Sequence, residues 1–496
     1  MSGAFDQESE GNAGMPTTER QKRPNIVLIM TDQQRYDSIA ALGHGHVDTP
    51  HLDRLVRQGT AFTNTYVASP SCAPSRASLF TGLYPHSSGV LRNDDKWSHS
   101  WVELLAESGY RCTSIGKMHT YPYEAPVGFH ERHVIENKDR AHPNLPYFLD
   151  QWDKAIWIRG HEKPSRVTYR TLPDYAERLG AFEWQLPDDL HADNFVGNLA
   201  RHWLDTYPGR DDPFFLQIGF PGPHPPYDPT AAHLDAYRDR EMPEAKRTQA
   251  DLDSQPTPLK KLREHHQAND HDAIVQLEDP TREQLDRQRR HYFANVSLID
   301  EQVGGLVDAL EQRGVLDDTI IVFTSDHGDA LNDHGHSQKW TMYEPSVHVP
   351  GIIWGPGRVA AGQQLDGLVS LMDFAPTLLE LAGLTAPEWM EAESLVPALD
   401  GDEWTGRRYV FSEHARDFIL TETALMTMVR DERFKLVEFI DYDEGQLFDL
   451  ETDPFEERNL WSDEEHRDTR VRLEKAIASW RASSSMTTAT WGKDWR

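Results

Sequence analysis

The chain has little cysteine, little lysine and no long apolar run. Only two cysteines, Cys72 and Cys112, occur in 496 residues, which excludes a fold held by a disulfide framework. The first apolar run, residues 26–30, is too short for a signal-peptide core or a membrane span, and no later run is long enough either. These absences predict a soluble, cytoplasmic protein with a disordered polar leader over residues 1–23.

Positive charge is also scarce. The chain carries 81 acidic and 50 basic side chains, which gives a formal net charge of −31. Nucleic-acid-binding proteins show the opposite balance, and anionic lipid repels an acidic surface, so we expect neither partner. A hydrophobic fraction of 38% and 14 tryptophans argue against an intrinsically disordered chain. The length suits one large domain or two.

Four short apolar runs, each followed by ionisable residues, indicate the strands of a buried sheet. They cover residues 25–30, 110–115, 214–220 and 319–325, and amphipathic helical patterns lie between them. Strands that alternate with helices predict an α/β sandwich with a large, mostly parallel central sheet. Because ligand groups collect beyond the carboxyl ends of such strands, we expect one rim to hold Asp32, Lys117, His119, His224, Asp326 and His327.

Two segments are predicted to be additions to this core, and the pattern changes after about residue 415. Segment 143–190 is rich in tryptophan without clear periodicity, and segment 241–290 is typical of a charged helical insertion. Beyond them, a small α+β subdomain is predicted from short strands over 424–429, 434–440 and 446–450 and a helix over 464–482. We therefore divide the chain into a main domain, residues 24–415, and a C-terminal subdomain with its tail, residues 416–496.

The sequence around Cys72 predicts that this cysteine lies at the start of a helix. In the segment SPSCAPSR, residues 69–76, Pro74 suits the first helical position, and Gly82 suits the position just past the last turn. The unpaired N–H groups of a helix N-terminus favour an anion, and Arg76, one turn in, can reach the same spot. A buried structural cysteine is the competing interpretation, against which the flanking proline and arginine argue.

The segment Cys72-Ala-Pro-Ser-Arg76 resembles the Cys-x-Pro-Ser-Arg signature of the type I sulfatases, which belong to the alkaline phosphatase superfamily. In that family a maturation enzyme oxidises the cysteine to Cα-formylglycine. The likeness spans nearly the whole chain and includes Thr49–Asp53, Thr81–Pro85, Gly116–His119, Asp326–Asp329 and Leu447–Leu450. It implies an alkaline-phosphatase-like sandwich, a catalytic role for residues 24–415, and hydrolysis of a small organic sulfate monoester.

The resemblance also implies a site for one divalent metal ion. Its ligands would be Asp32, Asp326, His327 and an oxygen of the modified Cys72, an oxygen-rich set that suits Ca²⁺, Mg²⁺ or Mn²⁺. Many sulfatases have paired aspartates where this chain has Asp32-Gln33, and asparagine where it has His327. These departures resemble the choline-sulfatase and phosphonate-monoester-hydrolase branch, which tends toward manganese. We therefore expect Mn²⁺ or Ca²⁺ rather than Mg²⁺. Taken singly, each carboxylate is better explained as a strand-end group that caps a helix.

Four further residues match active-site positions of the family. Lys117 and Lys339 resemble the lysines that hold sulfate oxygens, although a surface lysine is the ordinary alternative. His119 and His224 match the family's histidines, and histidine titrates near neutrality, as acid–base catalysis requires. Asn93 follows Cys72 at a spacing seen in the choline-sulfatase-like branch, which implies a contact with the anion.

The resemblance implies the following mechanism for hydrolysis of the sulfate ester. The formylglycine hydrates to a geminal diol, and one hydroxyl, activated by the metal, attacks sulfur in line. His224, aided by Lys339, protonates the departing alcohol, and Arg76 orients the diol. The second hydroxyl then loses its proton to His119, so that sulfate leaves and the aldehyde is regenerated.

Two other functions compete with this one. A phosphonate monoester or phosphodiester hydrolase would use the same metal and nucleophile, but such enzymes tend to lack the Lys117/His119 pair and Ser75. A catalytically silent binding protein on the same scaffold is the second alternative. The expected partners are a small sulfate ester, the maturation enzyme, and further copies of this chain in a dimer or tetramer. The identity of the leaving group stays open, although Trp152, Trp157 and Trp184 could line its pocket.

Overall fold

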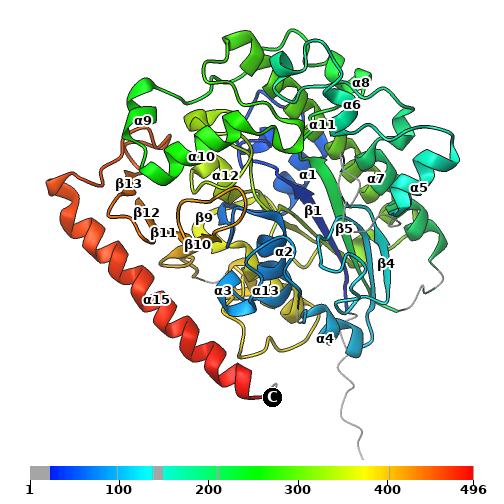
Figure 1. Ribbon diagram of the computed structural model, residues 1–496. Helices are drawn as coiled ribbons and strands as arrows, with labels where there is room; N and C mark the ends of the chain where they lie inside the picture. Colours follow the sequence, from blue (N-terminus) through cyan, green and yellow to red (C-terminus); the bar gives the residue numbers. More distant parts are fainter. Residues whose placement is uncertain are drawn as a thin grey trace, which may run out of the picture.

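The computed structural model describes residues 23–494 except 98, 137, 139–148, 208, 210–211 and 402, with side chains of the last helix only as far as residue 487 (Figure 1). Residues 1–22 of the expected leader lie outside the described residues. Arg23 donates a hydrogen bond of 2.8 Å to the carbonyl of Ser108. Within the described part of the chain, no helix has the length and apolarity needed to cross a membrane.

The central sheet of the main domain has nine strands in the described residues. Their spatial order is β4-β3-β5-β1-β6-β8-β2-β7, with β9 paired to β2. The strands are β1 (Asn25–Asp32), β2 (Thr60–Tyr66), β3 (Arg111–Gly116), β4 (Glu131–Val134), β5 (Phe214–Pro223), β6 (Thr319–Ser325), β7 (His348–Val349), β8 (Gly351–Trp354) and β9 (Gln363–Ser370).

The four predicted strands are β1, β3, β5 and β6, and they are neighbours in one parallel block. β1 is parallel to β5 on one side and to β6 on the other, and β3 is parallel to β5. Antiparallel pairing begins at β8 and includes β2 and β7. The mixed α/β fold with a mostly parallel central sheet is therefore confirmed, and the carboxyl ends of these four strands meet at one edge.

Successive residues of β1 pack on opposite faces of the sheet. Ile26, Leu28 and Met30 belong to one hydrophobic cluster, and Val27 and Ile29 to another. A strand covered on both faces needs apolar side chains at every position, which explains its unbroken apolar sequence. The first cluster includes residues of α2 (Cys72–Thr81), α4 (Val102–Glu107) and α13 (Phe374–Leu381), and the second includes residues of α1 (Pro50–Gln58), α7 (Ala192–Thr206) and α11 (Arg282–Gln312).

The two predicted insertions contain short helices at the periphery (Figure 1). Segment 143–190 holds α5 (Gln151–Ile158) and α6 (Arg166–Tyr169), and segment 241–290 holds α9 (Gln249–Ser254) and α10 (Thr257–Ala268). The long helix α11 begins inside the second insertion, because a capping box at Thr281 starts it there. The remaining helices of the main domain are α3 (Pro85–Ser88), α8 (Ala231–Asp235), α12 (Glu344–Val347) and α14 (Val396–Leu399).

The C-terminal subdomain is an antiparallel sheet with one long helix against it. The sheet consists of β10 (Val410–Ala415), β11 (Leu425–Arg430), β12 (Phe434–Phe439) and β13 (Gly445–Asp449), and the helix is α15 (Arg467–Asp494). The sheet thus begins ahead of the expected boundary at residue 416. The helix also extends past the expected end at residue 482. Buried Ser484 contributes to that extension, since its hydroxyl lies 2.7 Å from His86 Nε2 of α3.

A buried ion cluster joins the subdomain to the main domain. Glu344 of α12 accepts a hydrogen bond of 2.9 Å from Lys435 Nζ and one of 2.6 Å from the hydroxyl of Tyr66. Glu456 pairs with the same lysine and accepts the backbone N–H of Glu344 at 2.6 Å. Because both carboxylates share one cation in a dry interface, the two sheets are held in a fixed relation.

Candidate active site

The helix that carries Cys72 starts earlier than the sequence predicts. α2 begins at Cys72 itself, with Ser71 as the preceding extended residue, so Pro74 is third in the helix rather than first. Gly82 ends the helix in a left-handed conformation with φ 71°, as predicted. The side chain of Asn93 accepts a hydrogen bond of 3.2 Å from the N–H of Ala73 and so caps the first turn of the helix. A prediction based on the position of Pro74 does not include this cap.

The carboxyl ends of β1 and β6 bring the predicted metal ligands to Cys72. Asp32, Cys72, Asp326 and His327 are all buried, and one ligand atom of each lies within 4.8 Å of the others. Cys72 Sγ is 3.1 Å from His327 Nε2 and 3.8 Å from Asp32 Oδ1. This sulfur marks the place that an oxygen of the oxidised residue would take.

Three cations surround this cluster. Arg76 donates to Asp326 at 2.7 Å, to Asp32 at 3.3 Å and to the carbonyl of Lys117 at 2.8 Å. Lys117 Nζ lies 2.8 Å from Asp32, and Lys339 Nζ donates to Cys72 Sγ at 3.0 Å. All three side chains are buried, so three positive charges lie beside the buried carboxylates inside a strongly acidic protein.

These contacts control the ionisation of the site. Burial opposes the charge on Asp32, but Lys117, His224 and Lys339 outweigh it and hold the pKa of Asp32 well below its usual range. Burial and Asp32 raise the pKa of the Cys72 thiol, whereas the neighbouring Lys339 lowers it, and the net shift is downward. By contrast, the other thiol, Cys112, is buried among apolar groups, and its pKa rises to about 12. Only Cys72 therefore has a reactive environment.

The ligand set fits a hard divalent cation. His327 donates its Nδ1–H to the carbonyl of Gly328 at 2.9 Å, so its Nε2 lone pair faces the cluster. The two carboxylates supply oxygen, and the oxidised Cys72 would supply another. A set of three oxygens and one imidazole nitrogen suits a hard divalent cation better than a thiolate-seeking metal.

Gln33, which stands where many sulfatases have a second aspartate, supports the site without being a predicted ligand. Its side-chain oxygen accepts a hydrogen bond of 3.1 Å from Lys339, and its amide nitrogen donates to Asp329 at 2.6 Å. Its backbone N–H donates to Asp326 Oδ1 at 3.0 Å. Sequence reasoning identified the departure from the family pattern but not this link between Lys339 and the strand end of β1.

The two predicted histidines come from loops after β3 and β5. His119 has a positive φ of 59°, and its backbone N–H donates to Glu136 at 3.3 Å. Burial raises the pKa of Glu136 to about 7. His224 donates its Nδ1–H to the carbonyl of Pro225 at 2.7 Å, and its Nε2 lies 3.9 Å from Asp272. Glu136 and Asp272 were not predicted, since nothing in their local sequence sets them apart.

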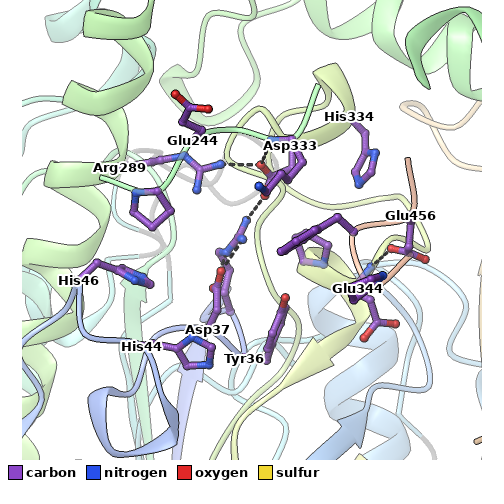
Figure 2. A pocket seen from close by; sticks show the side chains of 16 residues that line it. Tyr36, Asp37, His44, His46, Glu244, Arg289, Asp333, His334, Glu344 and Glu456 are labelled. Atoms are coloured by element: carbon purple, nitrogen blue, oxygen red, sulfur yellow. Dashed lines mark hydrogen bonds and ion pairs between the residues drawn. The ribbon is translucent and has the colours of Figure 1, made fainter. Parts of the chain in front are cut away.

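A cavity of about 310 Å³ is lined by none of the predicted catalytic or metal-binding residues (Figure 2). Tyr36, His44 and Asp333 are among its lining residues, and Figure 2 shows the hydrogen bond between Arg289 and Asp333, which measures 2.6 Å. Arg35 in its wall donates to Asp333 and to the carbonyl of Asp329, both at 2.8 Å. This wall therefore braces the loops after β1 and β6.

The fold and the cluster together define a metal-assisted hydrolase of the alkaline-phosphatase-like superfamily. Residues 24–384 match the family model described as "Sulfatase", and residues 332–483 match the one described as "N-sulphoglucosamine sulphohydrolase, C-terminal". The chain therefore belongs to the sulfatase family and is a sulfuric ester hydrolase.

Individual relatives cover nearly the whole chain. An arylsulfatase of Clostridium perfringens is 32% identical over 92% of this chain and 94% of that protein. A choline-sulfatase of Rhizobium meliloti is 32% identical over 88% of this chain and 82% of that protein. Among solved structures, a phosphonate monoester hydrolase of Agrobacterium radiobacter superposes with a TM-score of 0.78 at 27% identity, covering 93% of this chain and 96% of that one.

Proposed function

We propose that the protein hydrolyses a small organic sulfate monoester to an alcohol and sulfate, with a formylglycine made from Cys72 as nucleophile. The observation that carries this proposal is the placement of Cys72 at the start of a buried helix, within 4.8 Å of the ligand atoms of Asp32, Asp326 and His327. These residues would hold one Mn²⁺ or Ca²⁺ ion. When bound, the ion would supply Lewis acidity that lowers the pKa of a hydroxyl on the hydrated aldehyde.

Arg76 and the lysines provide the anion site. Arg76 is fixed by three hydrogen bonds, two of which bridge Asp32 and Asp326. Lys117 and Lys339 lie on two sides of the cluster, where they would hold the non-bridging oxygens of the sulfate group. With the N–H groups at the start of α2, they would stabilise the charge that develops on those oxygens.

His224 and His119 carry the proton transfers. In His224 the Nδ1–H is committed to the carbonyl of Pro225, so Nε2 is the atom that can donate to the leaving oxygen. Burial and Lys339 hold the pKa of His224 well below its usual range. A sulfate ester bound between Lys117 and Lys339 would add negative charge and favour the protonated imidazole. His119, on the Lys117 side, would accept the proton that releases sulfate.

The phosphonate monoester hydrolase is the second candidate, because the solved structure of such an enzyme superposes over 93% of this chain. Against it stands the Lys117/His119 pair, which resembles a pair that sulfatases have and phosphonate hydrolases tend to lack. We favour the sulfate ester, and we favour a small one because the nucleophile and both lysines are almost fully buried. The printed names of the relatives, arylsulfatase and choline-sulfatase, fit such substrates.

Two measurements test the proposal together. The protein is expressed with a formylglycine-generating enzyme, and the mass of the peptide that contains Cys72 is determined. We expect the aldehyde, and an unmodified thiol in an active enzyme would refute the nucleophile. Turnover of phenyl sulfate and of a phenyl phosphonate monoester is then compared in the same preparation. We expect kcat/KM to favour the sulfate, and the reverse order would establish the second candidate.

The remaining assignments are also proposals. Residues 24–415, apart from strand β10 at their end, form the catalytic domain, which is supported by the extent of the sulfatase match over 24–384. The partners are the sulfate ester, the maturation enzyme and further copies of this chain in a dimer or tetramer. Nucleic acid and membranes are not among them, because the net charge of −31 disfavours both. The two buried cysteines form no disulfide, which is consistent with a cytoplasmic location.

A further inference from the structure

A carboxylate from the second insertion faces the proton donor proposed above. Asp272 lies in the turn between α10 and α11, where Asp272 and Ala273 both have positive φ, 53° and 63°. Such angles are uncommon for residues other than glycine. The turn brings Asp272 to within 3.9 Å of His224, so the insertion contacts a predicted active-site residue.

The contact between Asp272 and His224 is close and sheltered. Asp272 Oδ2 lies 3.9 Å from His224 Nε2, and their side chains are 12% and 9% exposed. The other carboxylate oxygen pairs with Arg166 of α6 at 3.3 Å. The turn is also fixed to the segment before Lys339, because Gln338 donates to the carbonyl of His271 at 3.0 Å. Asp272 is thus held in register with both His224 and Lys339.

Charged groups facing His224 act in opposite directions. Lys339 and Lys117 disfavour the protonated imidazole, whereas Asp32 and Asp272 favour it. Asp32 is already engaged by Lys117 and by Arg76. Of these carboxylates, Asp272 has an oxygen within ion-pair distance of Nε2, at 3.9 Å, and Nε2 is the nitrogen that must carry and deliver the proton.

We propose that Asp272 is a positioning residue for His224: its carboxylate, 3.9 Å from Nε2, stabilises the imidazolium form from which the leaving oxygen takes its proton. This inference rests on the proposed function, in which His224 protonates the leaving group. As the nucleophilic oxygen bonds to sulfur, the bond between sulfur and the ester oxygen breaks, and its electron pair goes to that oxygen. The oxygen takes the proton from Nε2, the imidazole becomes neutral, and the alcohol departs. Asp272 keeps its charge, and His224 regains a proton from water.

The role predicts a dependence on the leaving group. A good leaving group such as 4-nitrophenolate departs without protonation, whereas an alkyl alcohol must be protonated as it leaves. In Asp272→Asn we expect kcat/KM for an alkyl sulfate to fall by about 10-fold or more, and that for 4-nitrophenyl sulfate by less than about 3-fold. The basic limb of the pH profile should move down by about half a unit to one unit, since the variant loses a charge that favours the imidazolium.

Two variants separate this role from a structural one. Arg166→Gln removes the cation that partly neutralises Asp272, so the basic limb should move up rather than down. If Asp272 served only to hold α6, Arg166→Gln and Asp272→Asn would instead have the same effect. Asp270→Asn is the matched control, because Asp270 lies in the same turn and pairs with Arg170 and Tyr175 rather than with His224. Its leaving-group dependence should equal that of the wild type.

These experiments distinguish failure of the role proposed for Asp272 from failure of the proposed function. An equal loss for all esters in Asp272→Asn with an unchanged basic limb would overturn the inference alone, as would a downward shift in Arg166→Gln. A wild-type enzyme that hydrolyses no sulfate ester would overturn the proposed function and this inference with it. So would a His224→Ala variant in which kcat/KM falls by the same factor for the alkyl sulfate and for 4-nitrophenyl sulfate.

Discussion

Arg76 is the buried cation whose removal tests how the site is held together. Its guanidinium is fully buried and joins the ends of β1 and β6 through Asp32 and Asp326, while also donating to the carbonyl of Lys117. Arg76→Met keeps most of the side-chain volume but removes the charge and the donors. The change therefore leaves two buried carboxylates short of a partner.

The expected loss of stability follows from these contacts. Removing one partner of a buried ion pair destabilises by about 3–5 kcal/mol, because an uncompensated charge stays buried. Asp32 keeps Lys117 at 2.8 Å, so the cost falls mainly on Asp326. We therefore expect the free energy of unfolding to fall by about 3 kcal/mol at pH 7 in metal-free protein, the lower end of that range.

Urea unfolding in EDTA, followed by tryptophan fluorescence, measures the change. Arg57→Met is the matched control, because Arg57 is 62% exposed and pairs with Asp53 at 3.6 Å on the surface of α1. Exposed pairs contribute little, so the control should lose less than about 1 kcal/mol. A similar loss in both variants would contradict the buried ion cluster.

The pH dependence gives a second criterion. Arg76 helps to hold the pKa of Asp32 below its usual range, so the stability that Asp32 contributes is present above its unfolded pKa of about 3.9 and is lost as the pH falls through the folded pKa. Without Arg76 the folded pKa of Asp32 lies higher. Lys117, His224 and Lys339 still lower the pKa of Asp32 in the variant, so the difference between wild type and Arg76→Met should be full down to about pH 4 and should shrink only below it. A difference independent of pH would show that packing, rather than charge, was lost.

Three further predictions concern the lysines, a buried acid and the metal. Lys339→Ala and Lys117→Ala should each lower kcat/KM for 4-nitrophenyl sulfate by about 100-fold or more, measured by initial rates, and an unchanged rate would remove that lysine from the anion site. Burial raises the pKa of Glu136 to about 7, so its ionisation in the folded protein costs about 3 kcal/mol of the free energy of unfolding. Glu136→Gln should therefore be more stable than the wild type above pH 7 but not below pH 4.5. A difference between variant and wild type that is the same at pH 5 and pH 8 in urea unfolding would contradict this. EDTA should abolish turnover, and Mn²⁺ or Ca²⁺ should restore it. The Asp326→Asn variant should need a higher metal concentration than the wild type to reach its half-maximal rate. Activity that survives chelation would argue against the metal site.

The parallel core and its rim could be predicted because they follow from local patterns. Unbroken apolar runs such as residues 26–30 occur where a strand is covered on both faces, and each of the four predicted strands is followed by the expected ionisable residues. The helix after Cys72 was also predictable from its glycine end, although its first residue was not. That start depends on Asn93, a cap from a distant part of the chain.

The supporting residues could not be predicted because they act across long distances in sequence. Gln33 contacts Lys339, and Asp272 contacts His224 from a turn with left-handed backbone angles. Neither residue lies in a periodic pattern, and each has a role only once the chain is folded. The strands β2, β8 and β9 were missed for a related reason, since their pairing mixes parallel and antiparallel neighbours at one side of the sheet.

The role of Cys72 as the source of the nucleophile is tested most directly by the rate of Cys72→Ala. Wild type and variant are expressed with the same maturation enzyme, loaded with the same metal, and compared by kcat/KM for 4-nitrophenyl sulfate. Loss of a covalent nucleophile should lower this value by more than about 1,000-fold while the protein stays folded. A folded Cys72→Ala protein with wild-type turnover would contradict the account.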